Sequence, residues 1–335
     1  MAPCWPENTT KVLIMKLLKR ISTSLFLVAI IGSSHAATFP DHAIRLIVPF
    51  TAGGNVDISA RTIAQGLTEQ LGQSIIVENK PGANTMIGTD FVAKSPTDGY
   101  TLLLAGAEGL AINPHVYKKV NYDALKDFSA IGLVGSFPFA LVINPKLPVN
   151  NLVEFIEYAK ARSGKLNYSS WGIGSTSQIA FEKLKQTSGI DLVHVPFQGA
   201  APAITAVAAG DVDAMMVPLS VALPQASSGR IKILGISTEK RIASADSIPT
   251  LSEQGVPVVI SGWQILVAPK NTPAAVIQTL NQSLNKVINS EATRSSLIKG
   301  GINPSPGTPA QANTLIESEW SRWGKVAKDA KISLD

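Results

Sequence analysis

The residues best suited to binding chemistry are Gly53 and Gly54, which stand between a short apolar run and a helical pattern. The run Leu46–Val48 is typical of a strand buried on both faces, and the helical pattern begins near Asn55. Glycines leave the backbone amides of such a turn uncovered, and the first turn of a helix has amides without intrahelical acceptors. A strand, a glycine turn and a helix N-terminus in this order predict an anion-binding site.

Three side chains near the predicted site have two interpretations each. Asp57 either contacts a ligand or stabilises the first helical turn and pairs with Arg61 at the i, i+4 spacing, and the second is favoured. Phe50 and Trp171 either form an aromatic wall over a ligand or belong to the core, where large aromatic side chains are equally common. The residues alone leave these alternatives open.

A second glycine turn, Gly172-x-Gly174, follows another predicted strand and superficially resembles a dinucleotide-binding loop. The third glycine of that motif is missing, and Asp191, the candidate ribose-binding acid, opens its strand instead of ending it. A simple anion-binding turn is the favoured interpretation, in which Ser175 and Thr176 place hydroxyls beside open backbone amides.

Groups that could perform catalysis are scarce. The chain has no Gly-x-Ser-x-Gly segment of a serine hydrolase and no group of His, Asp and Glu residues at metal-ligand spacing. His194 lies in the apolar run Leu192–Val195 and is predicted to be a core histidine that hydrogen-bonds to the backbone. We therefore expect no catalytic residue, no metal site and no cofactor, which favours binding over turnover.

The N-terminus has the pattern of a secretory signal peptide. Basic residues from Lys16 to Arg20 precede the apolar run Leu25–Ile31, which is too short to span a bilayer, and small residues follow up to Ala36. We predict cleavage after Ala36, which removes residues 1–36 and exports the mature chain to a bacterial periplasm. The alternative is an uncleaved membrane anchor, and the true start is either the first methionine or the one that directly precedes the basic residues.

The composition excludes several classes of protein. The chain has 335 residues, of which 45% are hydrophobic, enough for about two domains with a large core. Removal of the signal segment lowers the formal net charge from +5 to about +2. No basic stripe with interleaved aromatics remains to suggest nucleic acid. The same removal takes away Cys4, the only cysteine, so the mature chain has no thiol chemistry and no disulfide.

Strands and helices alternate along the mature chain, which predicts an α/β fold with parallel sheets. Ligands in such sheets bind beyond the carboxyl ends of the strands, where the two glycine turns and the predicted loop Gly106–Gly109 lie. Two helices at the C-terminal end have no sheet of their own and are expected to pack on the first domain. The predicted strands are Leu46–Val48, Ser74–Val77, Thr101–Ala105, Phe139–Ile143, Leu166–Ser169, Leu192–Val195, Ala214–Val217, Ile231–Ile236 and Gly262–Ala268.

Two crossings of the chain between the predicted domains, near residues 139 and 261, suggest two lobes joined by a hinge. Lobe 1 is expected to comprise residues 37–138 and 262–335, and lobe 2 residues 139–261.

Several segments, in order along essentially the whole mature chain, resemble the solute-binding proteins of tripartite tricarboxylate transporters, which are Bug-type periplasmic receptors. So many matching segments in the family's order make coincidence an unsatisfactory explanation. The segments are Ile47-Val48-Pro49-Phe50-Thr51-Ala52-Gly53-Gly54-x-x-Asp57, Val77-Glu78-Asn79-Lys80-Pro81-Gly82-Ala83, Asp98-Gly99-Tyr100-Thr101-Leu102-Leu103, Ala111-Ile112-Asn113-Pro114, Gly164-Lys165-Leu166-Asn167-Tyr168, His194-Val195-Pro196-Phe197-Gln198-Gly199 and Gly210-Asp211-Val212-Asp213.

The resemblance implies a two-lobed periplasmic-binding-protein fold of the flytrap type, in which each lobe is a mostly parallel sheet flanked by helices. It also implies that a small carboxylate binds in the interlobe cleft and that closure of the cleft presents it to membrane transporter subunits. Such receptors normally act as monomers. The residues expected at the ligand are Phe50, Thr51, Ala52, Gly53, Gly54, Asn55, Asp57, Ala107, Glu108, Trp171, Gly172, Gly174, Ser175, Thr176, Phe197, Gln198, Gly199 and Val217.

The chain departs from the family's pattern in ways that bear on the ligand. The segment Asp213–Pro218 lacks the acidic or amide pair that members often carry, which removes a contact for an ammonium group. Glu108 lies in a loop that is commonly small and polar, and it could meet an ammonium, meet a hydroxyl or face solvent. Trp171 is bulky for its place. We expect a carboxylate without an α-amino group, apolar or aromatic in part.

Two rival functions share the expected fold. The protein could deliver its signal to a two-component sensor instead of a transporter, or it could be an exported enzyme. Neighbouring genes for two membrane subunits would favour the transporter, and turnover of a bound solute would favour the enzyme.

Overall fold

The computed structural model of the protein describes Met1, residues 39–242 and residues 245–333. The predicted signal peptide therefore falls almost entirely outside the described residues. All the helices and strands below belong to one compact unit, His42–Asp335. In the described ranges, no helix combines the length and the apolar character needed to cross a membrane.

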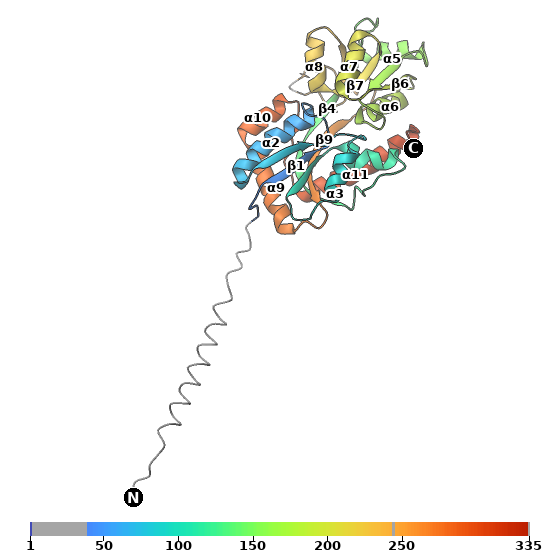
Figure 1. Ribbon diagram of the computed structural model, residues 1–335. Helices are drawn as coiled ribbons and strands as arrows, with labels where there is room; N and C mark the ends of the chain where they lie inside the picture. The colour runs from blue at the N-terminus through green and yellow to red at the C-terminus, as the bar shows by residue number, and fades with distance from the viewer. Residues whose placement is uncertain (2–38, 243–244, 334–335) are drawn as a thin grey trace. The chain divides into compact units, whose positions relative to one another are not determined.

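The first part of the chain builds three parallel strands with connecting helices (Figure 1). Strand β1 (Ile44–Val48) leads through α2 (Asn55–Leu71) to β2 (Ile75–Asn79), and α3 (Met86–Ala93) leads on to β3 (Thr101–Ala105). The strands lie in the order β2-β1-β3, and both neighbouring pairs are parallel. β1 and β3 are almost wholly buried, which explains their continuous apolar runs.

A second set of parallel strands repeats this arrangement. Strand β5 (Asn167–Ser170) leads through α6 (Thr176–Ser188) to β6 (Val193–Pro196), and α7 (Ala200–Ala209) leads on to β7 (Ala214–Pro218). β5 lies between β6 and β7 and is parallel to both. The carboxyl ends of these strands lead into the glycine turns and helix N-termini that the sequence singled out.

The long strand β4 (Phe128–Ile143) joins the two sets of strands. Up to Pro138 it pairs antiparallel with β9 (Ser261–Pro269), and β9 also pairs with β3. From Phe139 onward β4 pairs antiparallel with β7 and with β8 (Lys232–Ile236). We call the strands β1, β2, β3, β9 and the first part of β4 the first sheet region. The strands β5 to β8 and the last part of β4 form the second sheet region.

Shorter elements fill the connections. The π-helix η1 (Glu108–Ile112) and the one-turn helix α4 (Asn113–Val116) follow β3. Helix α5 (Leu152–Lys160) follows β4, and α8 (Leu219–Ser227) follows β7. Strand β10 (Asn303–Pro304) pairs with β4 in the first sheet region. The predicted loop after β3 is thus a buried turn of π-helix, since all five residues of η1 are buried.

The C-terminal part of the chain contains three helices where the sequence analysis expected two. Helix α9 (Ala274–Asn289) packs on α2 and β4, α10 (Glu291–Lys299) packs on α2 and α9, and α11 (Pro309–Asp329) packs on β4 and η1. The expected packing on the first domain is therefore present, although α11 also contacts α6. The extra helix, α10, buries only Thr293 and Leu297, too few apolar positions to show a helical period.

The predicted strand Phe139–Ile143 is only the end of β4. Its first part carries Gly132, Gly135 and Pro138, residues that weaken or interrupt strand patterns. The ladder with β9 shifts register near both glycines. A side chain at Gly135 would have no room, because a Cβ there would lie 2.5 Å from a methyl carbon of Ile302.

Candidate functional site

The turn between β1 and α2 leaves a row of backbone amides open. Gly53 has a φ of +81°, in the left-handed region that glycine adopts without strain. No side chain caps α2 at Gly54. Within the described part of the chain, the backbone amides of residues 54–57 have no hydrogen-bond acceptor. Amides at the positive end of a helix dipole attract an anion, and the anion site at this turn stays a prediction.

The carboxylate of Asp57 holds this turn from the inside. It is 3% exposed and accepts hydrogen bonds from the backbone N–H of Gly53 at 2.9 Å, from Arg61 at 3.0 and 3.1 Å, and from the side-chain amide of Asn79 at 2.9 Å. Burial alone would raise its pKa, but these hydrogen bonds outweigh burial and hold the pKa of Asp57 below its usual value. The pairing with Arg61 is therefore present, and Asp57 positions the glycine turn.

Asn55, the first residue of α2, connects the two sheet regions. Its Oδ1 accepts a hydrogen bond from Gln264 Nε2 at 2.9 Å, and its Nδ2 donates to the carbonyl of Gly300 at 3.2 Å and to Ser220 Oγ at 3.4 Å. Ser220 lies in the first turn of α8, on the second sheet region. The side chain of Asn55 is thus occupied by protein partners, which leaves its backbone amide for a ligand.

Glu108 forms a second connection between the sheet regions. It opens η1 and is only 5% exposed. Its Oε1 accepts hydrogen bonds from the backbone N–H of Thr176 at 3.2 Å and from the Thr176 hydroxyl at 2.5 Å. Thr176 is the first residue of α6. The sequence left open whether Glu108 meets an ammonium group, meets a hydroxyl or faces solvent. In the structure it accepts a hydrogen bond from a hydroxyl, and that hydroxyl belongs to Thr176 of the protein itself.

Phe50 and Glu108 border the same small space beside Gly106. A Cβ on Gly106 would lie 3.4 Å from Glu108 Oε2 and 3.9 Å from Phe50 Cζ. The aromatic ring after β1 and the carboxylate after β3 therefore lie close together, as expected for neighbouring strands that end at one edge of a sheet.

The glycine turn before α6 lies against the first sheet region. Gly172 and Gly174 both have positive φ, +141° and +75°. The side-chain amide of Asn84 donates to the carbonyl of Gly174 at 3.0 Å, and the Tyr117 hydroxyl donates to the carbonyl of Ile173 at 3.4 Å. Together with the Glu108 contact, these bonds attach the turn to three separate segments of the first sheet region.

The two hydroxyls predicted to meet a ligand already have protein partners. The hydroxyl of Ser175 donates to the carbonyl of Gly172 at 2.6 Å and accepts from the backbone N–H of Gln178 at 3.3 Å. The hydroxyl of Thr176 donates to Glu108. These side chains therefore shape the N-terminus of α6.

The remaining predicted residues of the second sheet region differ in exposure. The ring of Trp171 stacks on Phe139 with centroids 6.0 Å apart, and Phe197 is partly buried against the core of the second sheet region. The side chain of Val217 is fully buried in that core, so it offers no surface to a ligand.

Among all eighteen predicted site residues, the exposed ones are Thr51, Ala52, Gly53 and Gln198. Ala107 is buried.

A pocket of about 700 Å³ lies where β4 passes from one sheet region to the other. It is bordered by α8, α10 and the adjoining ends of β4, β8 and β9, and among the described residues the buried hydroxyl of Thr238 in it has no hydrogen-bond partner. None of the eighteen predicted residues lines it. The sequence did not predict this pocket, because its walls are formed by strand edges and helix faces that are far apart in the chain. The one local pattern at the pocket that the sequence shows is the start of a helix at Leu219-Ser220.

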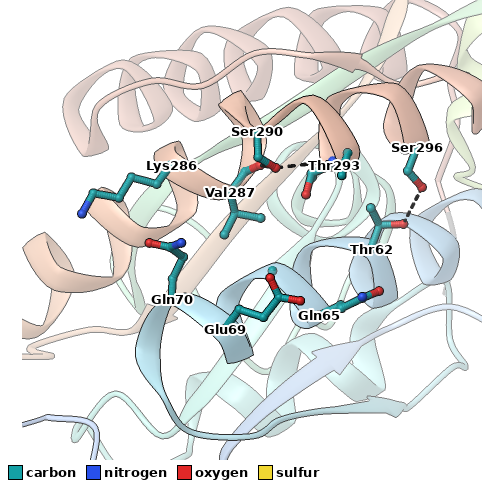
Figure 2. A pocket seen from close by; sticks show the side chains of 11 residues that line it. Thr62, Gln65, Glu69, Gln70, Lys286, Val287, Ser290, Thr293 and Ser296 are labelled. Atoms are coloured by element: carbon teal, nitrogen blue, oxygen red, sulfur yellow. Dashed lines mark hydrogen bonds between the residues drawn. The ribbon is translucent and has the colours of Figure 1, made fainter.

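A smaller pocket of about 200 Å³ lies between α2 and the pair α9 and α10 (Figure 2). Its lining side chains come from the facing sides of these helices, and Thr62 and Ser296 within it hydrogen-bond to each other at 3.3 Å. It contains none of the predicted residues, and we assign it no role.

His194 is a half-buried residue behind the glycine turn of α6. Its Nε2 lies 2.7 Å from Ser170 Oγ, and its ring stacks on Tyr168. The predicted backbone partner is therefore wrong, because a hydroxyl on the neighbouring strand is within reach. Burial and the positive charge of Lys185 lower the pKa of His194 to about 4, which keeps the ring neutral at pH 7.

Acidification is expected to destabilise the protein through His194. Its folded-state pKa lies below the unfolded value of about 6.5, so the unfolded chain binds more protons between these values. The stability that the neutral ring contributes is complete above pH 6.5 and is lost as the pH falls towards 4. Thermal unfolding temperatures of a His194→Gln variant should therefore decline less between pH 6.5 and 4 than those of the wild type. Equal declines would contradict this role.

The described residues contain no group of three His, Cys, Asp or Glu side chains that could hold a metal ion. The site instead combines open backbone amides on α2, aromatic rings and several hydrogen bonds between two sheet regions. These features can hold and enclose an anion.

The mixed α/β fold, with two connected sheet regions whose parallel strands alternate with helices, is that of the periplasmic binding proteins. Within this class, the chain belongs to the tripartite tricarboxylate transporter family of receptors, the Bug-type solute-binding proteins. The model for "Tripartite tricarboxylate transporter family receptor" matches residues 59–332.

Known proteins of this kind resemble the chain over most of its length. It is 34% identical to "Protein BugT" of Bordetella pertussis over 89% of this chain and 92% of that protein. The solved structure "R. palustris Rpa4515 with adipate" has 34% identity and a TM-score of 0.83, covering 88% of this chain and all of that one. "MatC (Rpa3494) from Rhodopseudomonas palustris with bound malate" has 29% identity and a TM-score of 0.79, covering 86% and 99%.

These comparisons confirm the family, the fold class and the prediction of a transport receptor rather than an enzyme. The boundaries of the two lobes and the identity of the ligand-binding residues stay predictions.

Proposed function

We propose that the protein is a periplasmic receptor that captures a small organic carboxylate between its two sheet regions and delivers it to the membrane subunits of a tripartite transporter. The observation that carries this proposal is the row of backbone amides at residues 54–57 that have no acceptor within the described residues. Amides at the positive end of a 17-residue helix are suited to a carboxylate. The relatives with bound adipate and malate support a ligand of this chemistry.

We further propose that lobe 1 comprises residues 37–138 and 262–335, and that lobe 2 comprises residues 139–261. The change of strand partners along β4 between Pro138 and Phe139, and the start of β9 at Ser261, support a hinge at these positions. In this arrangement the contacts of Asn55 and Glu108 with the second sheet region belong to the closed form. Rotation about the two strands would separate them and admit the ligand.

The proposed ligand is a carboxylate without an α-amino group. The segment Met215-Met216-Val217 is fully buried and apolar, so it offers no side-chain contact for an ammonium group. The aromatic rings of Phe50 and Trp171 favour a partly apolar acid. Calorimetry with dicarboxylates, amino acids and aromatic acids tests this, and tight binding of aspartate or glutamate would contradict it.

The receptor itself is tested by native mass spectrometry of protein purified under gentle conditions. We expect a single chain with one small acid bound, unmodified after long incubation. A protein that binds none of the acids in the calorimetric panel and carries no co-purified acid would contradict the proposed function.

Export by a cleavable signal peptide gives a direct prediction. The protein recovered from the periplasm should begin at Ala37, since cleavage is expected after Ala36. The intact mass of the purified chain measures this position. A mass that includes residues 1–36 would instead indicate a retained membrane anchor.

A further inference from the structure

We propose that Glu108 is a specificity-determining residue whose carboxylate occupies the N-terminus of α6, so that the ligand presents a hydrogen-bond donor, and not a carboxylate, at that end of the site. This inference rests on the proposed receptor function, because it names the chemistry that the same site accepts.

The contacts of Glu108 are those that a bound anion would make. A backbone N–H and a hydroxyl from the first residue of α6 both donate to Oε1, in the first turn of a 13-residue helix. Hydrogen bonds of this kind to a charged acceptor are strong, and the helix dipole adds to them. None of the ion pairs recorded among the described residues includes Glu108, so the start of α6 provides the main polar partners of this buried carboxylate.

The other amides near this helix start are also largely satisfied. The N–H of Gly174 donates to Gln178 Oε1 at 2.7 Å, and the N–H of Ser175 donates to the carbonyl of Gly172 at 3.2 Å. The N–H of Gln178 donates to Ser175 Oγ. The N-terminus of α6 is therefore occupied by the protein, whereas the N-terminus of α2 has open amides. The N-termini of α2 and α6 therefore differ in what they can accept.

Packing fixes the position of the Glu108 carboxylate. Residues 109–112 are buried, and a Cβ on Gly109 would lie 2.8 Å from Thr89 Oγ1, so η1 lies directly against α3. The hydroxyl of Tyr122 donates to the carbonyl of Gly109 at 2.8 Å. The side chain of Glu108 therefore extends from a tightly packed segment, and this packing holds its carboxylate in position.

The second oxygen of Glu108 is available to a ligand. Among the described residues no hydrogen bond to Oε2 is recorded, and this oxygen lies on the same side of Gly106 as the ring of Phe50. A hydroxyl or an ammonium group beside Oε2 would donate to it. A ligand carboxylate in the same place would face the carboxylate of Glu108 with no hydrogen-bond donor between the two groups, which is unfavourable.

Acetate is the first probe. The Glu108→Ala substitution leaves a space where the carboxylate was, and acetate is a free carboxylate that matches this space in size. Thermal unfolding is measured with sodium acetate against sodium chloride at the same ionic strength. We expect acetate to raise the unfolding temperature of Glu108→Ala by about 2 °C or more, because it stabilises only the folded state. The wild type and the control Glu69→Ala, an exposed glutamate on α2, keep the Glu108 carboxylate in place and should show a clearly smaller shift.

A double variant, Glu108→Ala with Thr176→Val, lacks one of the two donors and should lose most of the acetate response. An acetate shift in Glu108→Ala no larger than that of the control would overturn the proposal.

Selectivity is measured by calorimetry with adipate, 6-hydroxyhexanoate and 6-aminohexanoate, which share a six-carbon chain and differ at one end. Glu108→Gln keeps the size of the side chain and an acceptor oxygen, which preserves folding if the alanine variant is unstable. We expect the preference for the hydroxy or amino acid over adipate to fall at least tenfold in Glu108→Gln. An unchanged preference would overturn the inference. If none of the three acids binds, the acids are wrong for the receptor, and the acetate experiment still decides the role of Glu108.

Discussion

The Gly54→Val substitution is expected to abolish carboxylate binding while the protein stays folded. Gly54 has an extended backbone, with φ of −77°, which any residue adopts. A Cβ there would lie 3.5 Å from the carbonyl oxygen of Thr51, an ordinary contact. The branched side chain would instead cover the open amides of the turn. Loss of two hydrogen bonds to a charged ligand lowers affinity by at least about 100-fold.

The measurement is calorimetric titration with the acid that gives the largest thermal shift in the ligand panel. Gln65→Val, on an exposed position of the same helix, is the matched control and should bind as the wild type does. Gly54→Ala should show an intermediate loss. If the Gly54→Val variant bound the acid with an affinity within threefold of that of the wild type, the turn would not be the group that holds the ligand.

Replacement of Asp57 by alanine is expected to lower both the stability of the protein and its affinity for the ligand. The carboxylate accepts hydrogen bonds from Gly53, Arg61 and Asn79, and its loss should reduce the free energy of unfolding by about 2 kcal/mol. The side chain of Arg61 is 54% exposed and regains water, which limits this cost. Affinity should fall about tenfold or more, because the glycine turn loses its internal support.

The ion pair of Lys325 and Asp329 provides the control. It has the same i, i+4 spacing but lies exposed on α11, so Asp329→Ala should lower the stability much less than Asp57→Ala does. The contribution of Asp57 also has a defined pH dependence. Its pKa is lowered on folding, so its contribution is complete above the unfolded pKa of about 3.9 and is lost as the pH falls below that value. An Asp57→Ala variant as stable as the wild type at pH 7 would contradict this account.

The part of the site that could be predicted from the sequence is the part built by local signals. The turn between β1 and α2 follows from an apolar run, two glycines and a helix start within about a dozen residues. The pair of Asp57 and Arg61 follows from helical spacing. By contrast, the hydrogen bond from Asn79 to Asp57 joins residues on different elements, and no local pattern indicates it.

The contact between Glu108 and Thr176 was beyond sequence reasoning for the same reason. The two residues are separated by 68 positions, and each lies at the start of a helix on a different sheet region. Sequence patterns place a glutamate after β3 but do not show that it is buried. The first part of β4 was missed because its glycines and proline interrupt the strand pattern, while its pairing with β9 supplies the hydrogen bonds.

A crystal structure of the protein with the acid selected by the thermal-shift panel tests the central claim most directly. We predict a carboxylate whose oxygens lie within hydrogen-bonding distance of the backbone amides of residues 54–57, with the two sheet regions closed around it. An acid bound only in the pocket between α8 and α10, with the glycine turn unoccupied, would contradict the account.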